Sequence, residues 1–386
     1  MPPYTSPTVI NMASDDLILI TGATGFLGSA TAVEAIQAGL AHRLLLMVRA
    51  PNPRQALERL WIQLKQIGAS DADLAQLGSQ QVLCAELPEL AGVAADPRLE
   101  QVSAVIHCAA LATFTDHPAL EKTNVDGTLA LAALMEGRPR LRRFLYIGTA
   151  MACGSHSAAD NSIPEMLSLP LAQEDHLVPY TRSKAIGERR LREHFPDLPL
   201  VVLRPSIVVG HTRLGCTPSQ SIFWVFMVWQ KLGVLTTSLD DKIDVVPVDW
   251  CARAILHLAL KETLAQPVFH LSAGVQSSRS FRQLDLALAA GGRKGVYGRG
   301  YERIEVGQID QLIPRIKVRI PDCNPRLLAR ALKLYGEFAR LNYVFSNRNL
   351  LAEGVASAPP LTEYIGLCAT STQNISIANQ MKWDFK

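Results

Sequence analysis

Three glycines spaced three residues apart follow directly on an apolar run near the start of the chain. The run LILI, at residues 17–20, is followed by TGATGFLGSA, which contains Gly22, Gly25 and Gly28. Glycines between a strand and a helix allow a tight turn and a close approach of the backbone to a ligand. The first turn of the helix adds unpaired N–H groups and a positive dipole end. The pattern predicts a strand, a phosphate-binding turn and a helix; a purely structural glycine turn is the alternative.

Strand-like and helix-like segments alternate along the chain as far as Pro205. We expect strands at Leu17 to Thr21, Arg43 to Val48, Gln81 to Ala85, Ala104 to His107, Arg143 to Ile147 and Leu198 to Arg204. These segments are short and rich in Val, Ile and Leu, as strands buried on both faces of a sheet should be. The fold class predicted is α/β, a Rossmann doubly wound parallel sheet with helices on both faces.

The regular alternation of strand-like and helix-like segments fades after residue 205, and we place the expected domain boundaries accordingly. We expect a flexible N-terminus at residues 1–15 and a dinucleotide-binding Rossmann domain at residues 16–205 and 243–273. A smaller, mostly helical C-terminal substrate-binding region should comprise residues 206–242 and 274–386.

Composition excludes several classes of protein. Hydrophobic residues make up 48% and charged residues 19%, which is typical of a globular chain, and a net charge of +3 is too small to argue for nucleic acid binding. Residues 1–14 lack the basic and apolar regions of a secretory signal, and the seven scattered cysteines show no metal-ligand spacing. The apolar segment SQSIFWVFMVWQKLGVL is too short for a membrane span, which needs about 20 residues. We therefore expect a cytoplasmic protein with no transmembrane segment.

The end of the second predicted strand indicates which dinucleotide binds. LLLMVRAPNPR carries Arg49 and Arg54, and no acidic residue follows until Glu58. An acidic residue at this position would bind the ribose hydroxyls of NAD, whereas an arginine can pair with the 2′-phosphate of NADP. The sequence favours NADPH; the alternative is that Arg49 is an ordinary solvated surface charge.

A second constellation lies further along the chain. In PYTRSKAIGERRL, Tyr180 and Lys184 are four residues apart and so share one face of the predicted helix. A lysine ammonium beside a phenol should lower the pKa of the tyrosine and make it a better proton donor. Upstream, the fifth strand runs into LYIGTAMACG, which places the hydroxyl of Thr149 just past a carboxyl end, where open α/β sheets bind ligands.

These motifs, in this order, resemble the extended branch of the short-chain dehydrogenase/reductase superfamily. VIHCAA, NVDGT and LRPSIVVG match further segments of that branch, and DVVPVDWCARAI and the tail YVFSNRNLLAEGVASAPPLTEYIGLC are similar to the thioester reductase and fatty acyl reductase (male-sterility-like) group. The resemblance implies that Thr149 and Tyr180 bind the substrate carbonyl, Lys184 binds the nicotinamide ribose, and Asn124 supports this catalytic set. The cofactor-binding residues that it implies are Gly22, Thr24, Gly25, Phe26, Leu27, Gly28, Arg49, Ala109, Lys184 and Pro205.

The chain departs from the family pattern at two positions, which leaves the shape of the substrate open. Gly148 stands where many members have a serine, and Cys153 where many have an aromatic residue near the nicotinamide or the substrate. A simple role as a helix-surface amide is the alternative for Asn124.

Two segments bear on the substrate. SIFWVFMVW is too apolar for a sugar-nucleotide site, so we expect residues 222–229 to line an acyl pocket; a core helix is the alternative. From Arg315 to Arg348 there are eight Lys or Arg against two acids, and an extended RIKVRI would put Arg315, Lys317 and Arg319 on one strand face. That face could meet the phosphates of CoA or an acidic carrier protein, or be simply a solvated basic face.

Three functions stay open on these grounds. The first is NADPH-dependent reduction of an acyl thioester, either an acyl-CoA or an acyl-carrier protein acting in trans, to an aldehyde and onward to an alcohol. The second is reduction or oxidation of a free aldehyde, ketone or sterol, and the third is a non-catalytic cofactor-binding protein. The intact Thr149, Tyr180 and Lys184 argue against the third. No nucleic acid partner is expected, and the oligomeric state is left open.

Overall fold

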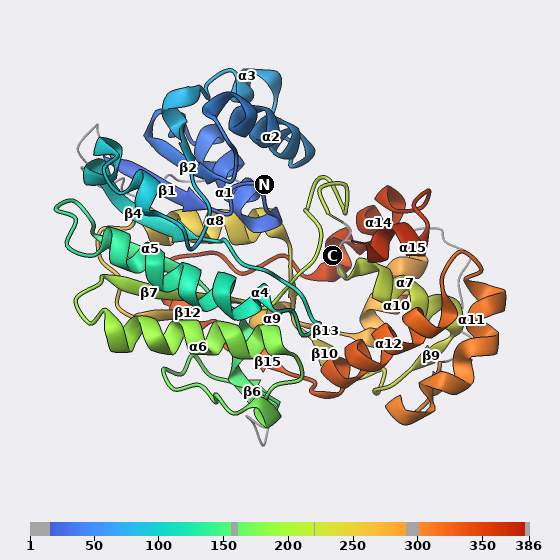
Figure 1. Ribbon diagram of the computed structural model, residues 1–386. Coiled ribbons are helices and arrows are strands. Elements are labelled where there is room, and N and C mark those ends of the chain that lie inside the picture. Colours follow the sequence, from blue (N-terminus) through green and yellow to red (C-terminus); the bar gives the residue numbers. More distant parts are fainter. Residues whose placement is uncertain (1–15, 156–160, 220, 291–300, 383–386) are drawn as a thin grey trace.

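A seven-stranded parallel sheet forms the centre of the protein. The computed structural model describes residues 16–155, 161–219, 221–290 and 301–382, so the expectation for residues 1–15 lies outside the described residues. The strands are β1 (Leu17–Thr21), β2 (Leu44–Val48), β3 (Val82–Cys84), β4 (Val102–His107), β5 (Arg143–Ile147), β7 (Leu200–Pro205) and β12 (Val268–Leu271). Their spatial order is β3-β2-β1-β4-β5-β7-β12 (Figure 1). The predicted Rossmann fold class is confirmed.

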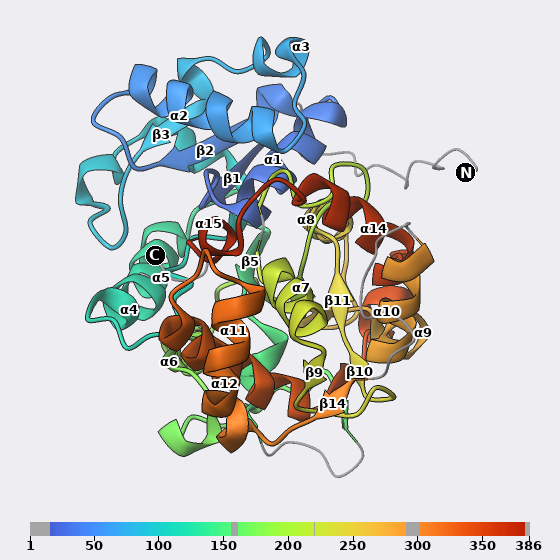
Figure 2. The same cartoon turned by 90° about the vertical axis from the view of Figure 1, so that its right-hand side faces the viewer.

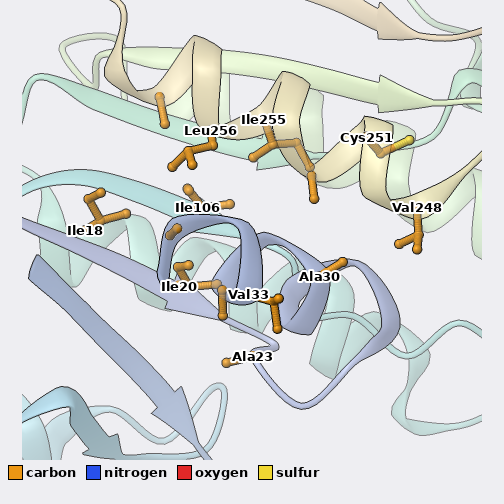
Figure 3. Packing of buried hydrophobic residues seen from close by; sticks show 14 of the residues in the cluster. Ile18, Ile20, Ala23, Ala30, Val33, Ile106, Val248, Cys251, Ile255 and Leu256 are labelled. Atoms are coloured by element: carbon orange, nitrogen blue, oxygen red, sulfur yellow. The ribbon is translucent and has the colours of Figure 1, made fainter. Parts of the chain in front are cut away.

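Helices cover both faces of this sheet. Along β1, Ile18 and Ile20 point into one hydrophobic cluster and Leu19 into another, as the two-residue period of a strand requires. The first cluster is closed by α1 (Phe26–Gln37), α2 (Pro53–Gln66) and α8 (Val248–Leu260), and the second by α5 (Gly127–Met135) and α6 (Pro179–His194). Figure 3 shows α1 and α8 packed side by side over the strands.

The order of the strands reverses between β1 and β4. The chain runs from β1 outward to β3, then crosses back to β4 and continues to β5, β7 and β12. The loops that leave the carboxyl ends of β1 and β4 therefore diverge, and open α/β sheets bind their ligands in the crevice at such a point. The glycine turn after β1 lies here.

A second hydrophobic core lies beside the sheet. It is built from α7 (Phe223–Leu232), α10 (Phe281–Ala290), α11 (Ile313–Arg319), α12 (Pro325–Arg340), α14 (Leu361–Ser371) and α15 (Ile377–Met381). Figure 2 shows this group of helices face on. Helix α12 begins after Asn324, whose side chain caps the helix, with Pro325 in its first turn. The following α13 (Arg348–Ala352) returns to the sheet, because Leu350 belongs to the core around β1 and β2.

Short elements join the two parts. The two-stranded pairings are β6 (Ser162–Ile163) with β15 (Val344–Phe345), β8 (Ile207–Val208) with β11 (Val245–Val246), β9 (Val234–Leu235) with β14 (Glu302–Arg303), and β10 (Lys242–Ile243) with β13 (Arg279–Ser280). Three short helices are α3 (Asp71–Leu74), α4 (Ala119–Glu121) and α9 (Gly274–Ser277). Among the described residues, no helix combines the length and the apolar character that crossing a bilayer demands.

The RIKVRI segment differs from the expectation. It forms helix α11 and its end rather than a strand, so Arg315, Lys317 and Arg319 do not share a strand face. The reason lies in the buried positions, since Ile316 and Ile320 point into the second core while Val318 is 78% exposed. A strand would have put Ile316, Val318 and Ile320 on one face, whereas a spacing of four residues suits a helix.

Candidate active site

The glycines of the turn after β1 are required by the close approach of neighbouring backbone segments. Gly22 has a φ of +67°, and a Cβ there would lie 2.7 Å from the backbone nitrogen of Ala109. A Cβ on Gly28 would collide with the carbonyl oxygen of Gly22. Helix α1 then starts after Gly25, and no side chain caps its first N–H groups. Bare backbone and free N–H groups at a helix N-terminus fit a pyrophosphate.

A chain of buried hydrogen bonds joins the carboxyl ends of β1 and β4 beneath the glycine turn. The Ala109 N–H donates to Oγ1 of Thr21 at 3.2 Å, and the Thr21 hydroxyl is 2.7 Å from Nδ1 of His107. On the other side Nε2 of His107 is 2.9 Å from the hydroxyl of Thr128, which donates to the Asn124 carbonyl oxygen at 2.7 Å. Burial lowers the pKa of His107 to about 3. A neutral imidazole with its proton on Nε2 satisfies every group in the chain.

One large cavity joins the glycine turn to the predicted catalytic residues. It has a volume of about 1050 Å³. Of the predicted site residues, those that line it are Gly22, Thr24, Gly25, Phe26, Leu27, Gly28, Arg49, Ala109, Thr149, Tyr180, Lys184 and Pro205. Asn124 and Cys153 do not line it. The structure thus brings together residues from the carboxyl ends of β1, β2, β4, β5 and β7 and from the helices α1 and α6.

Two residues that carry hydroxyl groups line this cavity from different elements. Thr149 follows β5, and its Oγ1 accepts the Met151 N–H at 3.3 Å, which leaves the hydroxyl proton for another acceptor. Tyr180 is the second residue of α6, and burial raises its pKa to about 12. Both hydroxyls are therefore neutral donors near pH 7, as a carbonyl oxygen that gains negative charge requires.

Lys184 lies one turn further along α6 and is almost fully buried. Its ammonium is 4.5 Å from the ring centroid of Tyr146, and burial lowers its pKa to about 8. The expected lowering of the Tyr180 pKa by this ammonium is not seen, because burial outweighs any neighbouring charge. Lys184 still supplies N–H donors to the cavity.

Asn124 acts behind the cavity. Its amide nitrogen donates to the Leu111 carbonyl oxygen at 3.1 Å and to Oγ of Ser183 at 3.0 Å, and its oxygen accepts the Leu111 N–H at 2.7 Å. Ser183 in turn donates to the carbonyl oxygen of Tyr180 at 2.7 Å. Asn124 therefore ties the loop after β4 to the first turn of α6 and is a positioning residue rather than a group that touches the substrate.

A buried ion pair holds α6 on the sheet. Arg204 on β7 is 1% exposed and donates to both carboxylate oxygens of Glu188 on α6, at 3.0 and 2.6 Å. Burying two charges has a desolvation cost, which their attraction offsets only when they form close hydrogen bonds at two points, as these side chains do. It fixes the helix that carries Tyr180 and Lys184.

At the far end of the cavity two arginines lie close together. Arg49 lines the cavity and pairs with Glu86 at 3.0 Å, with both side chains more than half exposed. Arg59 on α2 also lines it and donates to the Arg49 carbonyl oxygen. Arg54 instead pairs with Glu58 on the helix surface and does not line the cavity. Arg59 was not singled out in the sequence because it reaches the strand end only through the packing of α2.

The other end of the cavity is apolar and rich in aromatic rings. Ile222, Val225, Phe226 and Trp229 line it from α7 and the residue before it. The alternate face of α7, including Trp224, is buried in the second core. The helix thus belongs to the second core and also lines the cavity, and the binding of an acyl group there stays a prediction. Tyr335 and Phe338 on α12 complete this apolar half.

The geometry can now be set beside known proteins. A family model described as male sterility protein, whose name marks it as NAD-binding, matches residues 20–255, more than half of the chain. The chain belongs to this family. The predicted membership of the extended short-chain dehydrogenase/reductases, in their thioester reductase and fatty acyl reductase group, is confirmed. So is the predicted class, an oxidoreductase with a nicotinamide cofactor.

Curated relatives of this male sterility family protein carry reductase names. Aldehyde reductase lnaA of Aspergillus flavus is 26% identical over 339 residues, 81% of this chain and 31% of that protein. Fatty acyl-CoA reductase wat of Drosophila melanogaster is 24% identical over 285 residues, 63% of this chain and 53% of that protein. The chain therefore spans about a third to a half of their length.

Solved structures share the fold of this male sterility family protein. The terminal R domain from the myxalamid PKS-NRPS biosynthetic pathway is 22% identical, with a TM-score of 0.70 over 94% of this chain and 91% of that one. A thiolation-reductase di-domain from an archaeal non-ribosomal peptide synthetase is 19% identical, with a TM-score of 0.63 over 93% and 75% of the two chains.

Proposed function

We propose that the protein reduces an acyl thioester, carried by CoA or by a carrier protein in trans, with NADPH. The product is an aldehyde, which the same site can reduce onward to an alcohol. The observation that supports this most strongly is the single cavity that joins the glycine turn and Tyr180 to an apolar wall on α7 and α12. One side suits a dinucleotide and the other an acyl chain, with two hydroxyl donors between them.

In the proposed reaction, each of the catalytic residues has its own role. When bound, the nicotinamide supplies a hydride to the carbonyl carbon. Thr149 and Tyr180 donate hydrogen bonds to the carbonyl oxygen as its negative charge develops, and Tyr180 gives up its proton. Lys184 orients the cofactor ribose. The resulting hemithioacetal breaks its carbon–sulfur bond, releases the thiol and leaves the aldehyde.

The two arginines at the far end of the cavity support NADPH over NADH. We expect Arg49→Ala to weaken NADPH binding by about 1.5 to 3 kcal/mol, as loss of a charged hydrogen bond does, or about 10- to 150-fold in Kd. NADH, which lacks the 2′-phosphate, should bind almost as before. The exposed Glu86 pair is worth about 1 kcal/mol or less, so a phosphate can displace it. We expect Arg59→Ala to show the same selective loss.

Fluorescence titration with both cofactors measures these effects. Arg54→Ala is the matched control, since Arg54 is a nearby exposed arginine outside the cavity. Equal losses for NADPH and NADH in the Arg49 variant would mean that this arginine acts structurally.

A second candidate is reduction of free aldehydes. The same catalytic residues serve an aldehyde, and the relative from Aspergillus flavus is named an aldehyde reductase. Only the response to substrates separates the two functions.

An acyl series tests the proposed function. Each buried CH₂ contributes about 0.8 kcal/mol, so kcat/KM for NADPH oxidation should rise about fourfold per carbon until the apolar half is filled. The assay compares acyl-CoA and acyl-carrier thioesters of increasing length with the matching aldehydes, and mass spectrometry identifies the products. Turnover of aldehydes alone would favour the second candidate. A rate that does not depend on chain length would remove α7 from the acyl site.

A further inference from the structure

Phe114 connects the catalytic helix to the apolar wall. It lies between β4 and α4, in the loop of residues 108–118, and it lines the cavity. Its ring centroid is 6.4 Å from that of Tyr180, 5.8 Å from that of Tyr335 in an edge-on arrangement, and 6.1 Å from that of Phe338. One side chain from the sheet domain thus contacts the catalytic tyrosine and two rings of α12 at the same time. These distances are typical of attractive aromatic pairs.

The backbone holds this ring in place from below. The peptide groups of Leu111, three residues before Phe114, are both bound by the buried amide of Asn124. Thr113 is 2% exposed, and its hydroxyl lies 3.0 Å from that of Thr115. The loop is therefore anchored before Phe114, a hydroxyl contact joins the residues on either side of it, and the ring forms part of the cavity wall.

The position of this wall bears on the reacting end of the substrate. A carbonyl oxygen bound by the Tyr180 hydroxyl places the carbonyl carbon and its two substituents just beyond the end of the tyrosine side chain. Phe114 packs against the tyrosine ring and against two rings of α12, so it lies where the catalytic residues meet the apolar half of the cavity. A side chain that is packed on two sides cannot move aside without losing these contacts.

We propose that Phe114 is a specificity-determining residue that excludes bulk on the carbon bonded to the carbonyl. Acyl groups that are unbranched at this carbon are then the preferred substrates. The inference rests on the proposed function in that it takes Tyr180 as the group that binds the carbonyl oxygen. It applies to a thioester and to an aldehyde alike.

A pair of isomers tests this inference at constant size and hydrophobicity. Hexanoyl-CoA and 2-methylpentanoyl-CoA are isomers; the second carries a methyl group on the carbon bonded to the carbonyl and has a main chain one carbon shorter. We expect the wild-type kcat/KM to favour the unbranched isomer by about 10-fold or more, within the range for one misplaced methyl group. Phe114→Ala should reduce this ratio to about threefold or less, and Phe114→Leu should give an intermediate value. Unchanged NADPH affinity shows that both variants are folded.

Phe226→Ala is the matched control. Phe226 lines the cavity from α7 but is not among the ring neighbours of Tyr180 in the described part of the chain, so its removal should slow both isomers and leave their ratio unchanged. A wild-type ratio near one, or a Phe114→Ala ratio equal to that of the wild type, would overturn the inference.

The same experiment separates this inference from the proposed function. If no thioester reacts, hexanal and 2-methylpentanal take the place of the CoA esters. A preference for hexanal that disappears in Phe114→Ala then supports the role of Phe114 while the thioester proposal fails. Absence of turnover with both classes would overturn both.

Discussion

Replacement of Tyr180 by phenylalanine should reduce kcat by about 10²- to 10⁴-fold, the usual contribution of a positioned proton donor. The loss is expected because burial keeps this phenol protonated and Tyr180 lines the cavity. The phenylalanine ring retains the packing against Phe114, so folding and NADPH binding should be preserved. Steady-state kinetics and a cofactor titration measure the two effects separately.

A second Tyr→Phe substitution serves as the control. Tyr364 on α14 has a buried hydroxyl without a hydrogen-bond partner among the described residues, and it does not line the cavity. Tyr364→Phe should therefore leave turnover almost unchanged. Near-normal turnover of Tyr180→Phe as well would remove Tyr180 from its proposed role.

Replacement of Thr149 by valine should lower kcat by about 10²- to 10³-fold, as removal of one oxyanion donor does. Valine keeps the branched shape but lacks the hydroxyl that we propose binds the carbonyl oxygen. It also loses the hydrogen bond from the Met151 N–H, which caps the short helix at residues 150–153 and is worth about 1 kcal/mol of stability. Thermal unfolding of each variant measures that smaller effect.

The serine variant separates the two roles of Thr149. Thr149→Ser keeps both the hydroxyl and the cap, so it should retain most of the activity. Near-normal turnover of the valine variant would show that the hydroxyl does not bind the carbonyl oxygen, and a serine variant as slow as the valine variant would show that the hydroxyl alone is not sufficient.

The strands of the sheet could be predicted because burial on both faces leaves a clear local pattern. The bounds predicted for Leu17 to Thr21 and Arg143 to Ile147 coincide with β1 and β5. The prediction of a strand for RIKVRI was wrong because alternating charged and apolar residues are typical of a strand, and the sequence does not show which apolar residues the second core buries. The buried Ile316 and Ile320 show the helical period only once that core is visible.

The sequence could predict only those residues of the candidate site that lie at the ends of strands or on one face of a helix. Thr149, Tyr180 and Lys184 follow from such local positions, and the cavity contains all three. Arg59 and Phe114 were missed, because the first reaches the cavity through the packing of α2 and the second through a loop that meets α12. No local pattern in the sequence reports a contact between segments that far apart.

The most direct test of the account is the fate of a labelled hydride. The enzyme is incubated with NADPH that carries deuterium on the transferring face of nicotinamide C4 and with a saturated acyl-CoA of the length that reacts best. We predict an aldehyde with one deuterium on its carbonyl carbon and an equal amount of free CoA; any alcohol formed should carry two. Free CoA with an unlabelled carboxylic acid, or deuterium transfer to added aldehydes but not to the thioester, would contradict the proposed function.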